Sequence, residues 1–278
     1  MRRLSAPITT VSTARVGPAW KNSDFAQLIS GRSAPAKTAA QRFLAKAVPL
    51  VFRGGERAEL MQDLVWPLNN LVFGELLGVP VPNMAAKGPS VSQIFDRFLG
   101  LNRRTALQSA LAQLSQAITS DAGGLSTSAD YATALLVVGH DSLAASLGAS
   151  LVGLLEEAAD ARLCDLDYPD DLPRTGVPYV ERIAQADCTI RGYEFHAEDR
   201  VRLFLDACPA RGSAYEEAPF FGRGRHLCLG KDLSQWVWRT LTQELARLPL
   251  RVRIRETRIR PNDYVFTMYD RIEVTIYE

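Results

Sequence analysis

The segment of this chain with the clearest chemical potential is FFGRGRHLCLG, residues 220–230, where one cysteine is surrounded by glycines and cationic side chains. Cys228 directly precedes an amphipathic stretch that predicts a helix, and the free N–H groups and positive dipole end of a helix start stabilise a thiolate. The three glycines let the backbone turn tightly and approach a flat partner without Cβ collisions. A thiolate on such a loop is suited to ligate a heme iron.

Two other interpretations of this loop are a buried structural cysteine and a phosphate-binding turn. An isolated cysteine is most often a small buried hydrophobic residue, and a glycine-rich turn before a helix can bind phosphate. However, the segment lacks the GK[ST] ending of a P-loop and lies far from an N-terminal βαβ unit, where a dinucleotide fingerprint is found. The sequence therefore favours iron over phosphate.

Composition excludes several classes of function. The chain has 278 residues, 47% of them hydrophobic, and a formal net charge of +1. It can bury a full core, and it lacks the charge excess that nucleic-acid and membrane-surface binders carry. None of the four cysteines lies in a C-x-x-C pair, which argues against a structural zinc site. We expect a cytoplasmic globular protein with reduced cysteines and with neither a nucleic-acid nor a membrane partner.

Hydrophobic periodicity divides the chain into an arm and a mainly helical domain. Residues 1–40 are rich in Ser, Thr, Ala and Pro and are predicted to form an N-terminal arm, partly disordered, which leaves 41–278 as a single domain. Apolar residues recur at helical intervals in three segments, residues 39–51, 56–77 and 91–119. Pro49 and Pro67 are expected to disturb the first two helices.

The longest periodic segment, residues 129–163, is apolar on most faces and is expected to run buried through the middle of the domain. It nevertheless carries His140, Asp141 and Ser142 at its centre, and buried polar groups cost free energy unless they are paired. Asp141 could simply be satisfied by a neighbour, and the Ser142 hydroxyl could bond to its own preceding turn.

The last hundred residues combine short strands with one helix. Alternating apolar residues predict strands between 179 and 207 and a β-hairpin or small sheet after residue 250. Residues 231–248 form an amphipathic helix whose apolar stripe consists of Leu233, Val237, Leu241, Leu245 and Leu248. The expected fold class is mainly α with small β elements.

Four segments resemble the cytochrome P450 superfamily, in the order in which the family has them. FGRGRHLCLG (221–230) matches the heme-binding signature F-G-x-G-x-[HR]-x-C-x-G at every defined position. VGHDSL (138–143) is similar to the oxygen-activation segment, and YVERIA (179–184) to the strand whose arginine reaches a heme propionate. QDLVWPLNNLVFGELLGVPVP (62–82) is similar to a helix of bacterial members that ends in a GVP turn, so the resemblance covers roughly residues 55–278.

This resemblance implies a truncated P450-like fold, of bacterial type and unusually short, that binds heme b (iron protoporphyrin IX). Cys228 would be the metal ligand, Arg182 and His226 would hold propionates, and Phe221 would shield the sulfur from water. The implied cofactor-binding residues are Cys228, His226, Arg182, Phe221, Gly222, Gly224 and Gly230.

The resemblance also implies a catalytic group on the long helix. Gly139 would leave room for dioxygen, and Asp141 with Ser142 would form the acid–alcohol proton relay. Cleavage of the O–O bond needs protons delivered to the distal oxygen, which a positioned acid can supply. Val137, Val138, Tyr264, Phe266 and Met268 are candidates for the substrate pocket.

The chain departs from the family pattern in length and in one motif. Length is missing before residue 40, after Gly88 and between Cys208 and Phe220. The best candidate for the family's E-x-x-R pair is Asp171-Leu-Pro-Arg174, with a shorter acid and a proline.

We expect a biosynthetic monooxygenase of secondary metabolism that acts on a small-molecule substrate and receives electrons from a separate ferredoxin and reductase. Basic residues for ferredoxin docking would be Arg211, Arg223, Arg225, Lys231 and Arg239. One alternative keeps the heme without monooxygenation: peroxide-driven oxidation, dehydration or rearrangement, or action on a carrier-tethered substrate. The other is a degenerate, non-catalytic P450-like partner protein. Exposed apolar surface left by the short chain predicts a homodimer or hetero-complex.

Overall fold

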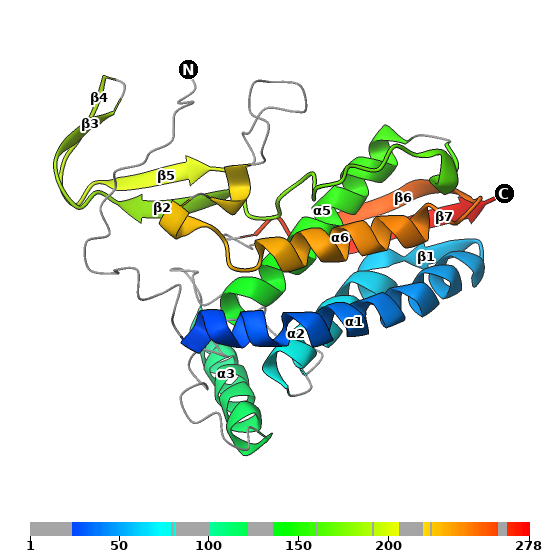
Figure 1. Ribbon diagram of the computed structural model, residues 1–278, viewed down its shortest axis with the longest axis horizontal. Coiled ribbons are helices and arrows are strands. Elements are labelled where there is room, and N and C mark those ends of the chain that lie inside the picture. The colour runs from blue at the N-terminus through cyan, green and yellow to red at the C-terminus, as the bar shows by residue number, and fades with distance from the viewer. Residues whose placement is uncertain are drawn as a thin grey trace.

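A computed structural model describes residues 24–78, 81, 100–121, 136–158, 161–190, 192–205, 219–222, 224–260 and 266–278. Its α-helices are α1 (Asp24–Arg53), α2 (Trp66–Leu77), α3 (Leu101–Asp121), α5 (Asp141–Glu157) and α6 (Lys231–Leu245). Its strands are β1 (Arg57–Glu59), β2 (Tyr179–Ile183), β3 (Cys188–Ile190), β4 (Tyr193–Phe195), β5 (Arg200–Phe204), β6 (Arg251–Ile259) and β7 (Tyr269–Tyr277). Figure 1 shows α1, α5 and α6 beside the sheet of β1, β6 and β7, with the β2–β5 and β3–β4 strand pairs at the far end.

The first helix, α1, is longer than the sequence predicts. It begins at Asp24 and continues through Pro35 and Pro49 to Arg53, so the disturbance expected at Pro49 does not end it. Fully buried side chains recur every four residues, at Ala36, Ala40, Leu44 and Val48, and this stripe packs the helix against the core. The helical region therefore begins at Asp24, within the predicted arm, and residues 1–23 lie outside the described residues.

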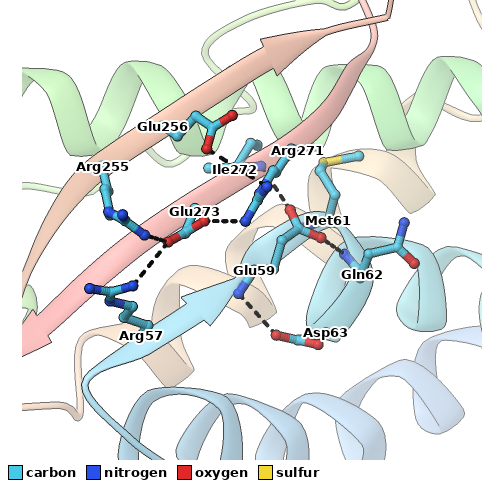
Figure 2. A network of polar contacts seen from close by, with 10 residues as sticks. All are labelled: Arg57, Glu59, Met61, Gln62, Asp63, Arg255, Glu256, Arg271, Ile272 and Glu273. Atoms are coloured by element: carbon cyan, nitrogen blue, oxygen red, sulfur yellow. Dashed lines mark hydrogen bonds and ion pairs between the residues drawn. The ribbon is translucent and has the colours of Figure 1, made fainter.

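Side chains cap the start of the helical segment at Met61 and connect it by a hydrogen bond to strand β7 (Figure 2). A π-helical turn, Met61–Val65, leads directly into α2. The Glu59 carboxylate accepts hydrogen bonds from the backbone N–H groups of Met61, Gln62 and, at 2.7 Å, Ile272 of β7. In return, Asp63 accepts the N–H of Glu59 at 2.9 Å. Three backbone donors at the start of this segment are thus satisfied by two side chains, in an arrangement similar to a capping box.

Strands β1, β7 and β6 form an antiparallel sheet in that order, with Ala58 and Ile254 both opposite Val274. Ile272, Val274 and Ile276 alternate towards the core, as a one-sided sheet requires. On the same strand the buried carboxylate of Glu273 binds the guanidinium groups of Arg255 and Arg271 (Figure 2). The predicted C-terminal hairpin is confirmed.

Helix α5 supplies the centre of the core. Nearly every residue from Leu143 to Leu155 is buried, which confirms the buried central helix. The segment Val138–Glu157 is long and apolar enough to cross a membrane, but most of it is buried inside the protein, as a core helix would be. The apolar stripe predicted for α6, from Leu233 to Leu248, is buried as well.

The irregular segment between α5 and β2, residues 166–178, contacts both α5 and α6. The indole Nε1 of Trp238 donates to the Pro169 carbonyl at 2.9 Å, and the Gln235 Oε1 accepts the N–H of Leu172 at 2.7 Å. At Gly176 the backbone approaches α5 so closely that an added Cβ would lie 2.2 Å from the Cβ of Ala145. Helix packing thus defines the path of the chain towards β2.

Candidate functional site

The loop that carries Cys228 is closed by backbone hydrogen bonds. Two 3₁₀ turns, Pro219–Phe221 and Gly224–His226, precede the start of α6. The Cys228 N–H donates to the Phe221 carbonyl at 2.7 Å, which joins the two ends of the loop. The predicted loop just before a helix is therefore present.

Two glycines of this loop have left-handed backbone angles. Gly222 has φ +70°, and a Cβ there would lie 2.4 Å from the carbonyl oxygen of His226. Gly224 has φ +58°, and nothing lies within 4 Å of the position of its Cβ. Both positions need glycine for conformation, but only Gly222 also needs it for space.

The Cys228 residue is exposed to solvent, although the loop and the start of α6 crowd one side of its sulfur. This desolvation raises the pKa of the thiol above its ordinary value of 9.0, and hydrogen bonds from the backbone of Gly230 and Lys231 offset only part of the rise. The thiol of the free chain is therefore protonated at neutral pH. The backbone donors at the helix start lower the pKa of the thiol, as expected, but desolvation has the larger effect in the opposite direction.

Phe221 and Gly230 lie on either side of the cysteine. Phe221 is buried, and its ring lies 4.6 Å from that of Phe220. Gly230 precedes α6, and a Cβ there would lie 3.8 Å from the Cys228 Sγ, an ordinary contact distance. A small residue at this position keeps the surroundings of the sulfur open.

The two residues implied to hold propionates lie on different elements. Arg182 is half-buried in β2, opposite Val201 of β5, and one of its guanidinium nitrogens donates to the Glu181 carbonyl at 2.8 Å. His226 is exposed in the 3₁₀ turn before Cys228. Their predicted roles stay predictions.

The predicted catalytic residues occupy both sides of the helix that begins with the π-helical turn Leu136–His140. His140 and Asp141 are 2% and 4% exposed, whereas Gly139 and Ser142 are half-exposed and Val138 is 59% exposed. The Ser142 hydroxyl donates to the Gly139 carbonyl at 2.9 Å, the bond to its own preceding turn that the sequence left open. The relay between Asp141 and Ser142 stays a prediction.

A buried polar cluster surrounds His140. Its Nδ1 lies 3.0 Å from the Asp141 Oδ1, and its Nε2 lies 2.8 Å from the Asn70 Oδ1. The imidazole stacks on Trp66 with ring centroids 5.8 Å apart, and Phe73 meets it edge-on at 5.4 Å. Asp141 therefore finds the neighbour that its burial requires.

Asn69 joins the backbone of the π-helical turn to α2. Its side-chain nitrogen donates to the His140 carbonyl at 2.8 Å. Sequence reasoning missed the contribution of α2 to this cluster, although two consecutive asparagines in an otherwise apolar helix were a usable signal. The sequence placed a polar group in the long helix but did not identify its partners.

The candidate E-x-x-R pair is not formed. Asp171 pairs with Arg239 at 3.0 Å, and Arg174 pairs with Glu157 at 3.2 Å. Each interaction is exposed, and the two residues that the motif would join face different helices. The prediction of Asp171 and Arg174 as that pair is wrong.

A shallow cavity of about 470 Å³ lies beside the cysteine loop, between α1 and α6. It is lined by Lys37, Asp171, Phe221, Lys231, Asp232, Gln235, Trp236 and Arg239. Lys231 and Arg239 of the predicted docking residues therefore share one groove. Arg211 and Arg223 lie outside the described residues, as does the side chain of Arg225.

Of the predicted pocket residues, Phe266 and Met268 are buried in the core, and Val138 is exposed. Tyr264 and the side chain of Val137 lie outside the described residues. The predicted pocket is therefore only partly described.

Comparison with known proteins identifies the fold. No family model matches the chain. Cytochrome P450 CYP105Q4 of Mycobacterium marinum is 21% identical over 83% of this chain and 67% of its own length.

Solved structures of the same class superpose over most of the chain. CYP109E1 from Bacillus megaterium, in complex with testosterone, gives a TM-score of 0.73 at 16% identity over 98% of this chain and 87% of that chain. P450BioI, in complex with an acyl carrier protein ligated to hexadec-9Z-enoic acid, gives 0.68 at 19% identity over 91% and 78%. The chain has the cytochrome P450 fold. The resemblance to the cytochrome P450 superfamily that the sequence predicts is confirmed, as is the mainly α fold class.

The residues of the cysteine loop fit a heme ligated through one thiolate. Cys228 is an exposed residue on a loop that is closed by backbone hydrogen bonds and contains two left-handed glycines. Exposed Leu227 beside it, and exposed Val138 on the helical turn, are apolar side chains that a large apolar ring could cover. Within the described residues no three His, Cys, Asp or Glu side chains cluster as a metal site would. A heme iron can be ligated through one cysteine thiolate.

Proposed function

We propose that this chain is a heme–thiolate oxidoreductase and, within that class, a monooxygenase of secondary metabolism. The observation that carries the proposal is the cysteine loop. An exposed cysteine residue, two left-handed glycines and the Cys228–Phe221 backbone hydrogen bond occur together on a P450 fold. Neither a structural cysteine nor a phosphate loop accounts for that combination.

Cys228 would ligate the iron of heme b as a thiolate. In that role the thiolate would donate electron density to the iron, which favours cleavage of the O–O bond. Because the pKa of the thiol is raised in the free chain, ligation has to displace a proton from Cys228. Phe221 would limit water near the sulfur, and Arg182 and His226 would pair with the propionates.

The turn that carries Gly139 and Ser142 would face the substrate. The half-exposed Gly139 has no side chain, which leaves space for dioxygen. The Ser142 hydroxyl donates its hydrogen to the Gly139 carbonyl, and its oxygen can still accept a hydrogen bond from a proton donor. Asp141, one residue earlier, is the carboxylate through which the proton would pass to that hydroxyl.

The proposed partners follow from chemistry and from the solved relatives. The substrate is a small molecule, and a carrier-tethered form is a candidate because P450BioI was solved with a ligated acyl carrier protein. Electrons would come from a cytoplasmic ferredoxin system that docks at the groove of Lys37, Lys231 and Arg239. Exposed Phe204 and Ile183 on the β2–β5 pair are candidates for a dimer or hetero-complex surface.

The absorption spectrum of the purified chain tests the proposal. Reduced protein with carbon monoxide should show the red-shifted band of a thiolate-ligated heme, and Cys228→Ser should lose that band. Cys188→Ser, a change of a half-buried cysteine on β3, is the matched control and should keep it. A wild-type chain that takes up no heme, or a Cys228→Ser variant with an unchanged band, would contradict the proposal. Substrate-dependent oxygen consumption with ferredoxin and reductase then separates monooxygenation from a peroxide-only activity.

A further inference from the structure

Both ring nitrogens of His140 face oxygen atoms. The Nδ1 contacts a carboxylate oxygen of Asp141 at 3.0 Å, and the Nε2 contacts the amide oxygen of Asn70 at 2.8 Å. An amide oxygen can only accept a hydrogen bond, so the Nε2 carries a hydrogen. A carboxylate in its ionised form likewise only accepts, so in an ion pair with Asp141 the Nδ1 carries one too.

We propose that His140 is a buried imidazolium that positions the carboxylate of Asp141. The Asn70 amide oxygen accepts the hydrogen of the His140 Nε2 and so keeps that nitrogen protonated. His140 is a positioning residue, because it would act on the reaction only through Asp141. The catalytic consequence rests on the proposed function, whereas the ion pair itself does not.

The surroundings of His140 suit a cation. Its ring is 2% exposed and stacks on Trp66, and the face of an indole attracts a positive charge. Arg260 lies over the same indole at 5.8 Å, and its own charge is paired with Asp270 at 2.9 Å. Asp141 is therefore the carboxylate that the described contacts place against the imidazole, and the two charges compensate one another inside the protein.

This arrangement gives Asp141 a fixed direction. One carboxylate oxygen, Oδ1, is engaged by His140 on the side of α2. Asn69 holds the backbone of the same turn through the His140 carbonyl. The side chain and the backbone of the turn are thus both attached to α2, and loss of the imidazole would remove the contact that directs Oδ1 of Asp141.

Replacing His140 with asparagine or with leucine distinguishes the contact to Asp141 from the contact to Asn70. Asparagine can place its amide nitrogen where the Nδ1 of His140 lies, so His140→Asn keeps a donor to Asp141 and loses the contact to Asn70. His140→Leu loses both donors. If His140 positions Asp141, the asparagine variant should retain most of the function that the leucine variant loses.

Nuclear magnetic resonance of the full chain, labelled with ¹⁵N-histidine, tests the ion pair. The protein is used as purified, reduced and saturated with carbon monoxide so that any heme is diamagnetic. The chain has three histidines, of which His196 and His226 are exposed. At pH 7, His140 should show two slowly exchanging ring N–H protons, which His196 and His226 should lack.

Two variants complete this test. Asn70→Leu should remove the slowly exchanging Nε2 proton, and Asn70→Asp should restore it because a carboxylate is again an acceptor. A wild-type His140 with one ring proton or none would overturn the proposal. So would two ring protons that persist unchanged in Asn70→Leu. Circular dichroism of each variant confirms that the fold is retained.

The functional arm measures product formed per pair of electrons consumed. His140→Leu should lower this ratio by about a hundredfold, the lower end of what general acid catalysis contributes, while the carbon monoxide band stays intact. His140→Asn should recover most of the loss. Equal ratios for wild type and His140→Leu would overturn the positioning role. If the wild type lacks the carbon monoxide band, the proposed function is refuted. The magnetic resonance result then still shows whether the ion pair between His140 and Asp141 exists.

Discussion

Replacing Gly222 with alanine should disrupt the loop that holds Cys228, because two separate costs fall on this one position. Alanine in the left-handed region costs about 1–2 kcal/mol, and Gly222 has φ +70°. The new Cβ would also lie 2.4 Å from the carbonyl oxygen of His226, and relief of such overpacking typically costs about 1–3 kcal/mol. The free energy of unfolding should therefore fall by about 2–5 kcal/mol.

Gly224→Ala is the matched control for this prediction. It introduces the same residue in the same loop at φ +58°, with nothing within 4 Å of the added Cβ. Only the conformational cost of about 1–2 kcal/mol applies. Urea denaturation of both variants, followed by far-ultraviolet circular dichroism, gives the two free energies. Heme titration of each folded variant reports whether the loop still presents the sulfur.

The comparison has a clear refuting result. If both variants lose the same stability and bind heme alike, the contact of Gly222 with the His226 carbonyl does not constrain the loop. A Gly224→Ala variant that is the less stable of the two would contradict the steric argument directly.

Two further predictions concern stability away from the cysteine. The hydrogen bond from Arg255, together with nearby cationic charge, lowers the pKa of Glu273 below its ordinary value of 4.5. Its ionised form therefore stabilises the fold above pH 4.5, and this stabilisation is lost as the pH falls below it. Glu273→Gln should unfold at lower urea than wild type at pH 7, and the gap should close as the pH falls below 4.5; a gap independent of pH would refute this origin. Gly176→Ala should leave little folded protein, since its Cβ would lie 2.2 Å from that of Ala145, whereas Gly55→Ala, with open space around it, should be near wild type by circular dichroism.

Sequence reasoning succeeded where the signal is local. The FGRGRHLCLG loop, the α6 stripe from Leu233 to Leu248 and the C-terminal hairpin each depend on residues close together in the chain. Turn glycines, 3.6-residue periodicity and strand alternation report such structure directly. Helix α1 was predicted to begin only at residue 39 because residues 1–40 are rich in Ser, Thr, Ala and Pro, although packing of Ala36 and Ala40 in the core accompanies a helix that begins at Asp24.

The parts that sequence reasoning could not supply depend on partners distant in the chain. The contact of His140 with Asn70 joins α2 to the turn before α5. The assignment of Asp171 and Arg174 failed for the same reason, because sequence spacing suggested one pair where the fold provides Arg239 and Glu157. The raised pKa of Cys228 depends on how closely the loop surrounds the sulfur, which spacing does not encode.

The pairing of β1 with β7 constrains the order in which the molecule is assembled. Ala58 lies opposite Val274, and the Glu59 side chain that caps the segment leading to α2 also accepts the N–H of Ile272. Contacts with such large sequence separation form slowly because a long loop has to close first. On the ribosome, β1 and α2 emerge long before their partner strand β7. The edge of β1 and the Glu59 side chain therefore lack their β7 contacts through most of synthesis. The helix that supports His140 thus reaches its final attachment only when the last described strand has been made.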